Sequence, residues 1–269
     1  MKIATCNVNG IRAAARKGMS DWIAAERPDI LLLQETRAPE ELIAPLIGDR
    51  YTVFSSVCRI KGRAGVAVAL RPGIEPGEVR AGLDYGTDGD GEPDVDSGRW
   101  LEVDIPEYDL TVVSAYLHAG DSANEDKMQA KYAHLDAVTQ RLSEPRTGRL
   151  LVGGDFNIVR GEGDIKNWAS NHNRTAGALD EEIAYLDKWF DEFGYSDVHR
   201  ALTPAGEQIA YTWWSQRGRA FDNNTGWRID YHLAVPELAK CATSARVDKA
   251  PSYDTRFSDH APLVINYNL

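Results

Sequence analysis

Short runs of apolar and β-branched residues, separated by amphipathic segments, constrain the fold of this chain more than any other feature. Runs of about 4–8 such residues between turn residues are typical of buried β-strands. These runs predict strands at residues 3–8, 30–33, 65–70, 100–105, 110–117, 150–154, 209–214, 227–235 and 262–267. Many short strands with helical segments between them indicate an α/β fold, in which two packed β-sheets carry helices on the outside.

Three segments predict helices. Residues 122–125 (Ser-Ala-Asn-Glu) match the capping-box pattern and predict the start of a long helix. Its buried face is marked by Met128, Tyr132, Leu135, Val138 and Leu142. A second helix is predicted over 179–193, with Gly194 as its C-cap, and a third over 20–27, where Pro28 stops it. The inward residues of the second helix are Leu186, Trp189, Phe190 and Phe193.

The composition fits one globular domain. A chain of 269 residues with 43% hydrophobic residues can bury a sizeable core, and no linker rich in Gly, Pro or Ser divides it, so residues 1–269 are expected to form a single domain. No apolar stretch approaches the roughly 20 residues that span a bilayer. The N-terminus lacks a signal peptide, and three cysteines at no metal-ligand spacing suit a reducing compartment. A cytoplasmic protein without a membrane partner is therefore expected.

The net charge of −11 argues at first against a nucleic-acid partner. Six acids and no base lie in residues 84–96, which are predicted to form a solvated surface loop, and without them the net charge is −5. Basic residues gather elsewhere, at Arg12, Arg16 and Lys17, at Arg59, Lys61 and Arg63, and at Arg217, Arg219 and Arg228. The affinity of a groove for nucleic acid depends on the charge near that groove and not on the net charge of the protein. This composition is therefore compatible with a nucleic-acid binder whose acidic residues lie away from the groove.

Polar residues stand at or near the ends of the predicted strands. They are Asn7, Asn9, Glu35, Asp155, Asn157, Asp230, Asp259 and His260. Because strand ends meet at one rim of a sheet, residues from opposite ends of the chain can share a pocket. Carboxylates, amides and an imidazole suit a hard cation such as Mg²⁺. They also suit phosphoryl transfer, in which an enzyme mainly positions groups and neutralises charge.

The acidic candidates also have plainer interpretations. Asp155 either belongs to an ordinary turn after a strand or lies beside an attacking water, with Asn157 as a donor to a phosphate oxygen. Glu35 is either an exposed residue that starts a loop or a metal ligand. Asp230 lies between apolar residues, where an unpaired charge is costly, so it needs a partner. His260 is the candidate partner of Asp230, because a carboxylate can hold an imidazole in one tautomer.

Each aromatic candidate also has two possible interpretations. Tyr116 is either a packing residue or a phosphate contact. Trp213 and Trp227 lie close to arginines in the sequence and form either core or a platform for a base or a sugar. The polar segment 171–174 is either a surface loop or a contact to a nucleic-acid backbone.

Several motifs run in order from Asn7 to His260: Asn-x-Asn-Gly, Gln-Glu-Thr, Gly-Asp-Phe-Asn, Arg-Ile-Asp and Ser-Asp-His-Ala-Pro. Together they resemble the exonuclease III family of AP endonucleases, within the deoxyribonuclease I-like endonuclease/exonuclease/phosphatase superfamily. The resemblance implies a four-layered α/β sandwich of mostly antiparallel or mixed sheets. It implies a DNA-repair nuclease that uses Mg²⁺, for which Mn²⁺ substitutes, as a 3′→5′ exonuclease, AP endonuclease and 3′-phosphatase or 3′-phosphodiesterase. The implied partner is double-stranded DNA with abasic sites, nicks or 3′ ends, bound by a monomer.

The resemblance also implies roles for individual residues. The implied catalytic residues are Tyr116, Asp155, Asn157, Asp230 and His260. The implied metal ligands are Asn7, Glu35, Asp155, Asn157, Asp259 and His260, with Glu35 as the main ligand. In this scheme Asp155 orients or deprotonates water, and Asp230 and His260 grip the scissile phosphate.

Contacts to DNA are expected from the resemblance and from the basic clusters. They are Asn9, Arg12, Lys17, Arg63, Arg99, Trp213, Arg217, Trp227 and Ile229. Trp213, Trp227 and Ile229 fall where the family builds its pocket for a baseless sugar. After Tyr116 the chain has Leu-His-Ala at 117–119, where many relatives have Pro and then Asn or Gln. The sequence therefore does not establish that this chain makes the DNA contact of those relatives at this position.

Two other functions remain open from the sequence. A phosphoesterase of the same superfamily, acting on phospholipids, inositol phosphates or RNA, would use a similar catalytic set. A non-catalytic nucleic-acid binder would have no chemical need for that whole set. The element Gly-Trp-Arg-Ile-Asp at 226–230 and the arginines near the tryptophans favour DNA.

Overall fold

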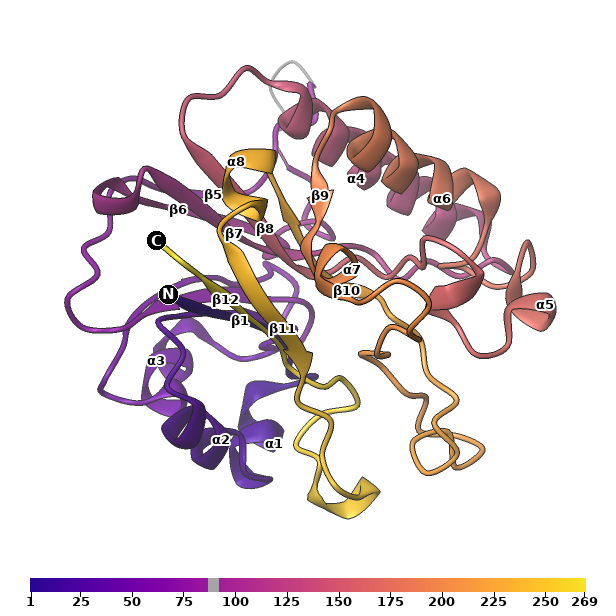
Figure 1. Ribbon diagram of the computed structural model, residues 1–269, viewed down its shortest axis with the longest axis horizontal. Helices are drawn as coiled ribbons and strands as arrows, with labels where there is room; N and C mark the ends of the chain where they lie inside the picture. The colour runs from indigo at the N-terminus through magenta and orange to yellow at the C-terminus, as the bar shows by residue number, and fades with distance from the viewer. Residues whose placement is uncertain (87–91) are drawn as a thin grey trace.

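Two six-stranded β-sheets form the centre of the computed structural model, which describes residues 1–86 and 92–269 (Figure 1). Across the first sheet the strands are β11 (Ala242–Val247), β12 (Leu263–Tyr267), β1 (Lys2–Asn7), β2 (Ile30–Gln34), β4 (Val66–Leu70) and β3 (Thr52–Ser56). Across the second they are β5 (Val79–Ala81), β6 (Trp100–Ile105), β7 (Leu110–Tyr116), β8 (Arg149–Asp155), β10 (Asp230–Ala234) and β9 (Ser196–Asp197). The pairs β1–β2 and β7–β8 are parallel and the other pairs are antiparallel.

The inner faces of the two sheets pack against each other. Ile3 and Val68 from the first sheet share one buried cluster with Val112 from the second. Burial of each such side chain contributes about 1.5–3 kcal/mol. The apolar runs that predict the strands therefore form the central core.

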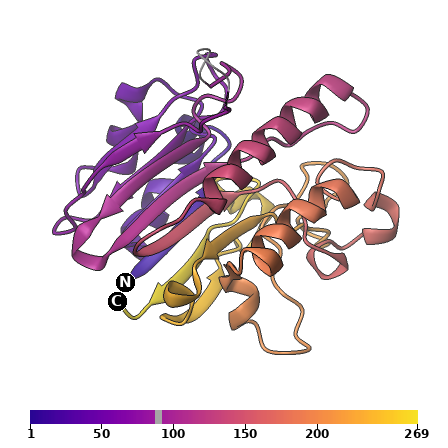
Figure 2. The ribbon, with the colours of Figure 1, turned by 90° about the horizontal axis from the view of Figure 1, so that it is seen from above.

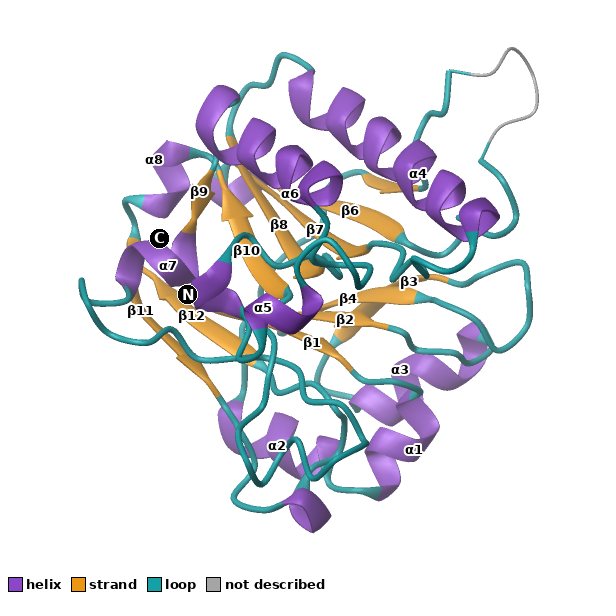
Figure 3. Ribbon diagram, turned by 90° about the vertical axis from the view of Figure 1, so that its right-hand side faces the viewer, coloured by secondary structure: helices purple, strands orange, loops and turns teal. Residues whose placement is uncertain are grey.

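Helices cover the outer face of each sheet and complete four layers. Figure 3 shows α4 and α6 on one side of the strands and α1, α2 and α3 on the other. The helices are α1 (Ile11–Arg16), α2 (Met19–Glu26), α3 (Ile43–Ile47), α4 (Glu125–Ser143), α5 (Trp168–Asn171), α6 (Asp180–Asp187), α7 (Val198–Leu202) and α8 (Pro236–Ala239). The termini lie side by side, where the Met1 amino group donates to the Tyr267 carbonyl at 2.5 Å (Figure 2). Within the described residues, no helix is long and apolar enough to cross a membrane.

The long helix α4 appears where it was predicted, but its predicted cap is wrong. Asn124 caps the helix by accepting a hydrogen bond from the Lys127 backbone N–H at 3.1 Å. Ser122 lies before the first turn and donates instead to the Arg174 carbonyl at 2.8 Å. Most predicted inward residues of α4 are buried, but Tyr132 is only half-buried. A Ser at the right spacing does not cap a helix when a neighbouring Asn is closer to its first turn.

The second and third predicted helices are also present. α6 continues into a π-helical segment, Lys188–Glu192, and Gly194 follows with a φ of 77°. Trp189 and Phe190 in this region are buried, whereas Phe193 is only half-buried. α2 covers almost all of the predicted helix at 20–27.

The predicted strand at 209–214 is wrong, and the one at 227–235 is confirmed only from Asp230 to Ala234. In segment 209–214, which is fully described, Trp213 alone forms bridge pairs, with Trp227 and His260. The four strands that the sequence did not predict are β3, β5, β9 and β11, which lie at the sheet edges. Edge strands carry exposed polar residues and lack a continuous apolar run. Because the prediction relied on such runs, it identified the central strands and not the edge strands.

The acidic segment 84–96 lies only partly within the described residues, and Asp88 and Asp90 fall outside them. At the end of this segment Asp96 is only 2% exposed and contacts His118. The prediction of a solvated loop is therefore wrong at Asp96, because a histidine from the second sheet holds its carboxylate inside the protein.

Candidate active site

Strand pairing brings the predicted site residues to one rim of the two sheets. Parallel pairing of β1 with β2 puts Asn7 beside Gln34. Parallel pairing of β7 with β8 puts Tyr116 beside Asp155. The antiparallel strand β10 starts at this rim, and its first residue, Asp230, pairs with Asp155. Because the sheets pack face to face, the polar ends of these strands meet.

A cleft of about 530 Å³ opens at this rim. The predicted site residues that line it are Asn7, Asn9, Glu35, Tyr116, Asp155, Asn157, Trp213, Trp227, Ile229, Asp259 and His260. Asp230 is fully buried behind His260. A larger cleft of about 810 Å³ near Ile23 and Ile47 contains none of these residues. Converging titratable groups, and not volume, identify the smaller cleft as the candidate active site.

Donors from two segments hold the Asp155 carboxylate. Its Oδ2 accepts hydrogen bonds from Asn7 Nδ2 at 2.9 Å and Asn157 Nδ2 at 3.1 Å. Its Oδ1 accepts from the Asn157 backbone N–H at 2.9 Å. The preceding residue must be small, because a Cβ on Gly154 would lie 1.8 Å from the Ala115 carbonyl oxygen. The glycine thus lets β8 approach β7 closely and places Asp155 at the rim.

His260 lies between two carboxylates. Its Nδ1 is 2.8 Å from Asp230 Oδ2, and its Nε2 is 3.7 Å from Asp155 Oδ2. The backbone N–H of Asp230 donates to Thr212 Oγ1 at 3.1 Å, which anchors the start of β10. This geometry confirms His260 as the partner of Asp230. A carboxylate on Nδ1 fixes the ring and directs Nε2 toward Asp155.

Glu35 is buried at the lining of the cleft and is not an exposed residue at the start of a loop. It is 8% exposed, and its Oε1 accepts hydrogen bonds from the Tyr116 hydroxyl at 2.7 Å and Arg37 Nη2 at 2.5 Å. The Glu35 backbone has a φ of 52°, in the left-handed region that non-glycine residues rarely adopt. Such strain typically costs about 1–3 kcal/mol and persists where surrounding contacts enforce it.

The buried charges shift one another's pKa values. Burial raises the pKa of Asp155, and Asp230 adds to this rise although His260 opposes it. Burial acts to lower the pKa of His260, but Asp230 and Asp155 outweigh it and raise that pKa. Burial, with a contribution from Glu35, raises the pKa of the Tyr116 hydroxyl. At neutral pH His260 is therefore an imidazolium and Tyr116 keeps its proton.

The donor chemistry of the cleft fits a divalent cation. Carboxylates of Glu35, Asp155 and Asp259 line it, and oxygen donors are the ligands that hard cations prefer. Asp155, Asp230 and His260 also offer ligand atoms that lie within 4.8 Å of one another. Among the described residues, Asp230 Oδ1 is buried without a hydrogen-bond partner. The acidic side chains here can therefore hold a metal ion, whereas His260 can do so only in its neutral form.

An aromatic wall adjoins the acidic residues. The rings of Trp213 and Trp227 pack edge to face with centroids 5.9 Å apart, and Ile229 lines the same cleft. Trp213 Nε1 donates to Asp259 Oδ2 at 3.3 Å, and Asn9 Nδ2 donates to Asp259 Oδ1 at 2.9 Å. The wall and the polar centre of the cleft are thus joined by hydrogen bonds.

None of the five predicted basic contacts, all within the described residues, lines the cleft itself. Arg63 and Arg99 line a neighbouring cleft, where the Arg99 guanidinium lies 4.7 Å from the centroid of the Tyr116 ring. Lys17 lines another cleft that shares Asn9 with the first. The remaining two, Arg12 and Arg217, are exposed.

Two supports of the site were not predicted from the sequence. Arg37 contacts Glu35, and its position two residues later was an available signal. Lys131 is fully buried, pairs with Glu182 at 2.6 Å and donates to the Asn157 carbonyl at 3.1 Å. No local signal identifies Lys131, because a lysine on a helix normally faces solvent.

Known proteins resemble this chain along its whole length. An exodeoxyribonuclease of Bacillus subtilis (strain 168) is 32% identical over 271 residues and covers all of both chains. A solved AP endonuclease from Archaeoglobus fulgidus is 28% identical with a TM-score of 0.84, again over all of both chains. The solved 3′ phosphatase NExo from Neisseria, bound to a product DNA hairpin, is 26% identical with the same coverage and a TM-score of 0.84.

The family model described as endonuclease/exonuclease/phosphatase family matches residues 4–260. This range contains the motif residues from Asn7 to His260 and all of the strands except the first two residues of β1 and the whole of β12. Together with the exodeoxyribonuclease and AP endonuclease relatives, this match confirms the expected relationship to exonuclease III and the AP endonucleases. This chain therefore belongs to the endonuclease/exonuclease/phosphatase family.

Proposed function

We propose that this protein is a Mg²⁺-dependent DNA-repair nuclease that breaks the bond between phosphorus and O3′ at 3′ ends, at abasic sites and at 3′ phosphates. The observation that carries the proposal is the convergence of the His260–Asp230 pair, Asp155 and Glu35 on one cleft. The relatives named as exodeoxyribonuclease, AP endonuclease and 3′ phosphatase support DNA as the substrate. These three activities break the same kind of bond, so one catalytic set can perform them all.

Asp155 orients the attacking water and takes its proton. Burial raises the pKa of Asp155, so its carboxylate is a stronger base than that of an exposed aspartate. Asn7 and Asn157 hold the carboxylate in place. As the water oxygen bonds to phosphorus, the P–O3′ bond breaks and its electron pair leaves with O3′.

His260, Asn157 and Tyr116 stabilise the charge that develops on phosphate. The His260 imidazolium is held by Asp230 through Nδ1, which leaves Nε2 to donate to a non-bridging oxygen. Removal of one such donor typically lowers the rate by about 10²–10³-fold. The Tyr116 hydroxyl keeps its proton, which it donates to Glu35 here, and acts as a neutral donor to phosphate once it turns away from Glu35.

Glu35 is the proposed main ligand of Mg²⁺, with Asn7 and Asp259 beside it and the other predicted ligands around the same cleft. Arg37 and Tyr116 both contact Glu35 Oε1, so Oε2 is the oxygen left for a cation. When bound, the ion supplies positive charge to the leaving O3′. Mn²⁺ is expected to substitute, because it also accepts carboxylate and carbonyl ligands.

The aromatic wall supports the proposed action at an abasic nucleotide. Trp213, Trp227 and Ile229 present apolar surface next to the catalytic centre. A deoxyribose without a base can pack against such a surface. A paired nucleotide is stacked in the duplex, and unstacking it so that it can enter the cleft costs a few kcal/mol.

In this proposal residues 1–269 act as one domain and as a monomer on duplex DNA.

The proposal is tested with the full chain on duplexes that carry an abasic site, a recessed 3′ end or a 3′ phosphate, each with Mg²⁺ and with EDTA. Cleavage that depends on Mg²⁺ and leaves a 3′ hydroxyl is expected on all three. Sphingomyelin, inositol phosphates and RNA serve as competing substrates. Faster turnover of any of these would assign another phosphoesterase activity, and tight DNA binding without turnover would indicate a non-catalytic binder.

A further inference from the structure

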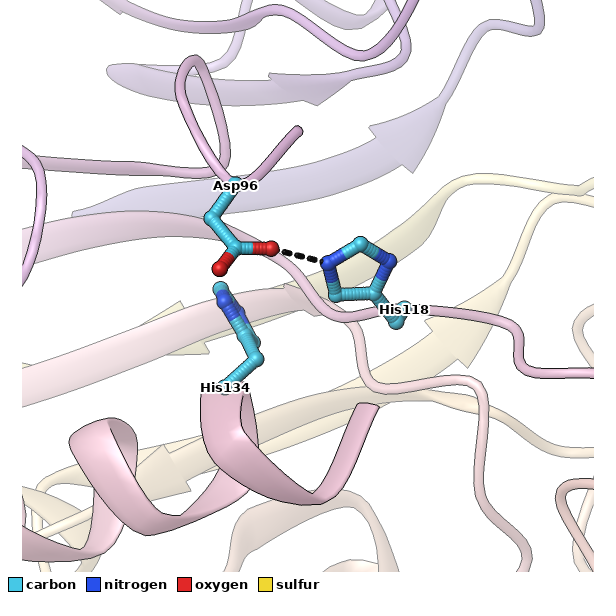
Figure 4. A group of neighbouring side chains, drawn as sticks. All are labelled: Asp96, His118 and His134. Atoms are coloured by element: carbon cyan, nitrogen blue, oxygen red, sulfur yellow. Dashed lines mark hydrogen bonds and ion pairs between the residues drawn. The ribbon is translucent and has the colours of Figure 1, made fainter. Parts of the chain in front are cut away.

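A second group of potential ligands lies beside the catalytic centre and has no part in the proposed reaction. Asp96 precedes β6, His118 follows β7, and His134 belongs to α4. Each offers one ligand atom, and these atoms all lie within 4.8 Å of one another. Figure 4 shows the His118 and His134 rings directed toward the Asp96 carboxylate from different elements. The structure therefore gathers three separate segments around one point.

The group is buried and incompletely hydrogen-bonded. Asp96 is 2%, His118 9% and His134 0% exposed. Asp96 Oδ1 contacts His118 Nε2, and His134 Nδ1 lies 2.7 Å from the Tyr85 hydroxyl. Among residues 1–86 and 92–269, His134 Nε2 has no hydrogen-bond partner. A buried polar atom without a partner costs about 1–3 kcal/mol, so this nitrogen points to an absent ligand.

An Asp96–His118 hydrogen bond by itself explains only part of this arrangement. It accounts for two of the three residues and leaves His134 fully buried with a free nitrogen. The two imidazole rings are perpendicular, with centroids 5.2 Å apart, so they approach each other without stacking. A hydrogen bond from His134 Nδ1–H to Tyr85 would leave the lone pair on Nε2, which is how partner groups prepare a histidine for a metal.

We propose that Asp96, His118 and His134 bind a zinc ion at a site separate from the catalytic cleft. Two imidazoles and a carboxylate suit zinc, whereas Mg²⁺ prefers oxygen ligands only. Zinc bonds to these ligands are about 2.0–2.2 Å long, so small side-chain movements would complete three positions of a tetrahedral site. Burial lowers the pKa of both histidines, which favours the neutral form that binds metal.

The zinc ion stabilises the side of the catalytic cleft that carries Tyr116. His118 lies two residues after Tyr116, and Asp96 lies three residues before Arg99, whose guanidinium covers the Tyr116 ring. Joining both segments to α4 fixes the end of β7 and the loop that leads into β6. This role does not depend on the nuclease activity and would persist in a catalytically inactive chain.

The test begins with the full wild-type chain, stripped with a chelator and then titrated with Zn²⁺ alone or Co²⁺ alone. We expect one tightly bound Zn²⁺ per chain after gel filtration, a Zn²⁺-dependent rise in melting temperature, and X-ray absorption that shows two imidazole ligands. Co²⁺ is expected to give the intense visible bands of a tetrahedral site. His118→Ala and His134→Ala should each weaken Zn²⁺ binding by at least about 100-fold.

Two control variants separate this site from other histidines. His260→Gln removes the imidazole of the catalytic cleft, and His172→Ala removes a half-buried histidine outside both groups. Both should keep the Co²⁺ spectrum. A wild-type chain without bound Zn²⁺, or His118→Ala and His134→Ala chains that bind it as the wild type does, would overturn the proposal. The wild-type stoichiometry and X-ray absorption decide the matter even if a variant fails to fold.

Discussion

Asp230 holds His260 through a hydrogen bond of 2.8 Å between Oδ2 and Nδ1. Asp230 is fully buried at the start of β10, and His260 comes from the segment before β12, which belongs to the other sheet. The pair therefore connects the two sheets at the rim of the cleft. It also keeps the imidazole charged, because Asp230 raises the pKa of His260 against the effect of burial. The proposed chemistry depends on this connection between the sheets.

Asp155→Asn is expected to lower the cleavage rate of abasic duplex by about 10²–10⁴-fold, since it removes the proposed base while keeping the side-chain size. Single-turnover cleavage and fluorescence anisotropy measure rate and binding separately. DNA affinity should change little, and the exposed control Asp21→Asn should change neither quantity. A matching loss of affinity would give Asp155 a structural role instead.

Glu35→Gln should raise the Mg²⁺ concentration needed for half-maximal activity by on the order of 10-fold or more, because a carboxylate ligand becomes a neutral amide. A Mg²⁺ titration of the cleavage rate measures this shift. Glu41→Gln, at an exposed position in the segment Glu40–Leu42, is the matched control. An unchanged Mg²⁺ dependence in Glu35→Gln would remove Glu35 from the metal site.

Arg217→Ala should weaken DNA binding and reduce the slope of log affinity against log salt by about 0.9, the value for one lost phosphate contact. Anisotropy titrations at several salt concentrations measure the slope. Arg50→Ala makes the same charge change at an exposed position that lines the distant cleft near Ile23. If both variants keep the wild-type slope, Arg217 does not contact the DNA backbone.

Gly154→Ala should destabilise the protein by at least about 1–3 kcal/mol, because its Cβ would lie 1.8 Å from the Ala115 carbonyl oxygen, a backbone atom that cannot move cheaply. Urea unfolding measures the change in free energy. Gly161→Ala is the control, since its Cβ would meet no atom within 4 Å among the described residues. Equal stability of the two variants would contradict the close approach of β7 and β8.

Arg228→Met should destabilise the protein by about 3–5 kcal/mol at neutral pH, because buried Asp197 loses its cation and buried Asp164 keeps only the partly exposed Arg200. Arg228 is fully buried and contacts Asp164 at 2.7 Å and Asp197 at 2.8 Å. The control Arg246→Met breaks partly exposed pairs with Glu26 and Asp248 and should cost less than about 1 kcal/mol.

The pH dependence of this loss follows from Asp197. Burial raises its pKa, but Arg228 outweighs burial and lowers it, so the contribution to stability is present above the unfolded pKa of about 3.9 and is lost as pH falls through the folded pKa. The stability difference between wild type and Arg228→Met, followed from about pH 7 down to about pH 2, should therefore be largest near neutral pH and shrink as the pH falls below about 4. Urea unfolding over this range measures it, and a constant difference would show that lost packing, and not charge, is responsible.

The sequence by itself determined the central strands and the polar residues at their ends. Central strands such as β1 and β8 require apolar side chains on both faces, which is a local property that a run of residues displays directly. Asn7, Glu35, Asp155 and His260 were predictable as a group because each stands at or near the end of such a strand. The edge strands were not predictable in this way, since one side of each meets solvent.

Only the tertiary structure decided which polar side chains share a buried contact. Lys131 and His134 lie on α4, where charged or polar residues normally face water, yet both are fully buried. Lys131 is held by Glu182 from α6, and His134 faces Asp96 and His118 from segments beside the second sheet. Burial of a polar group is favourable only when partners from other segments surround it, and spacing along one segment carries no information about those partners.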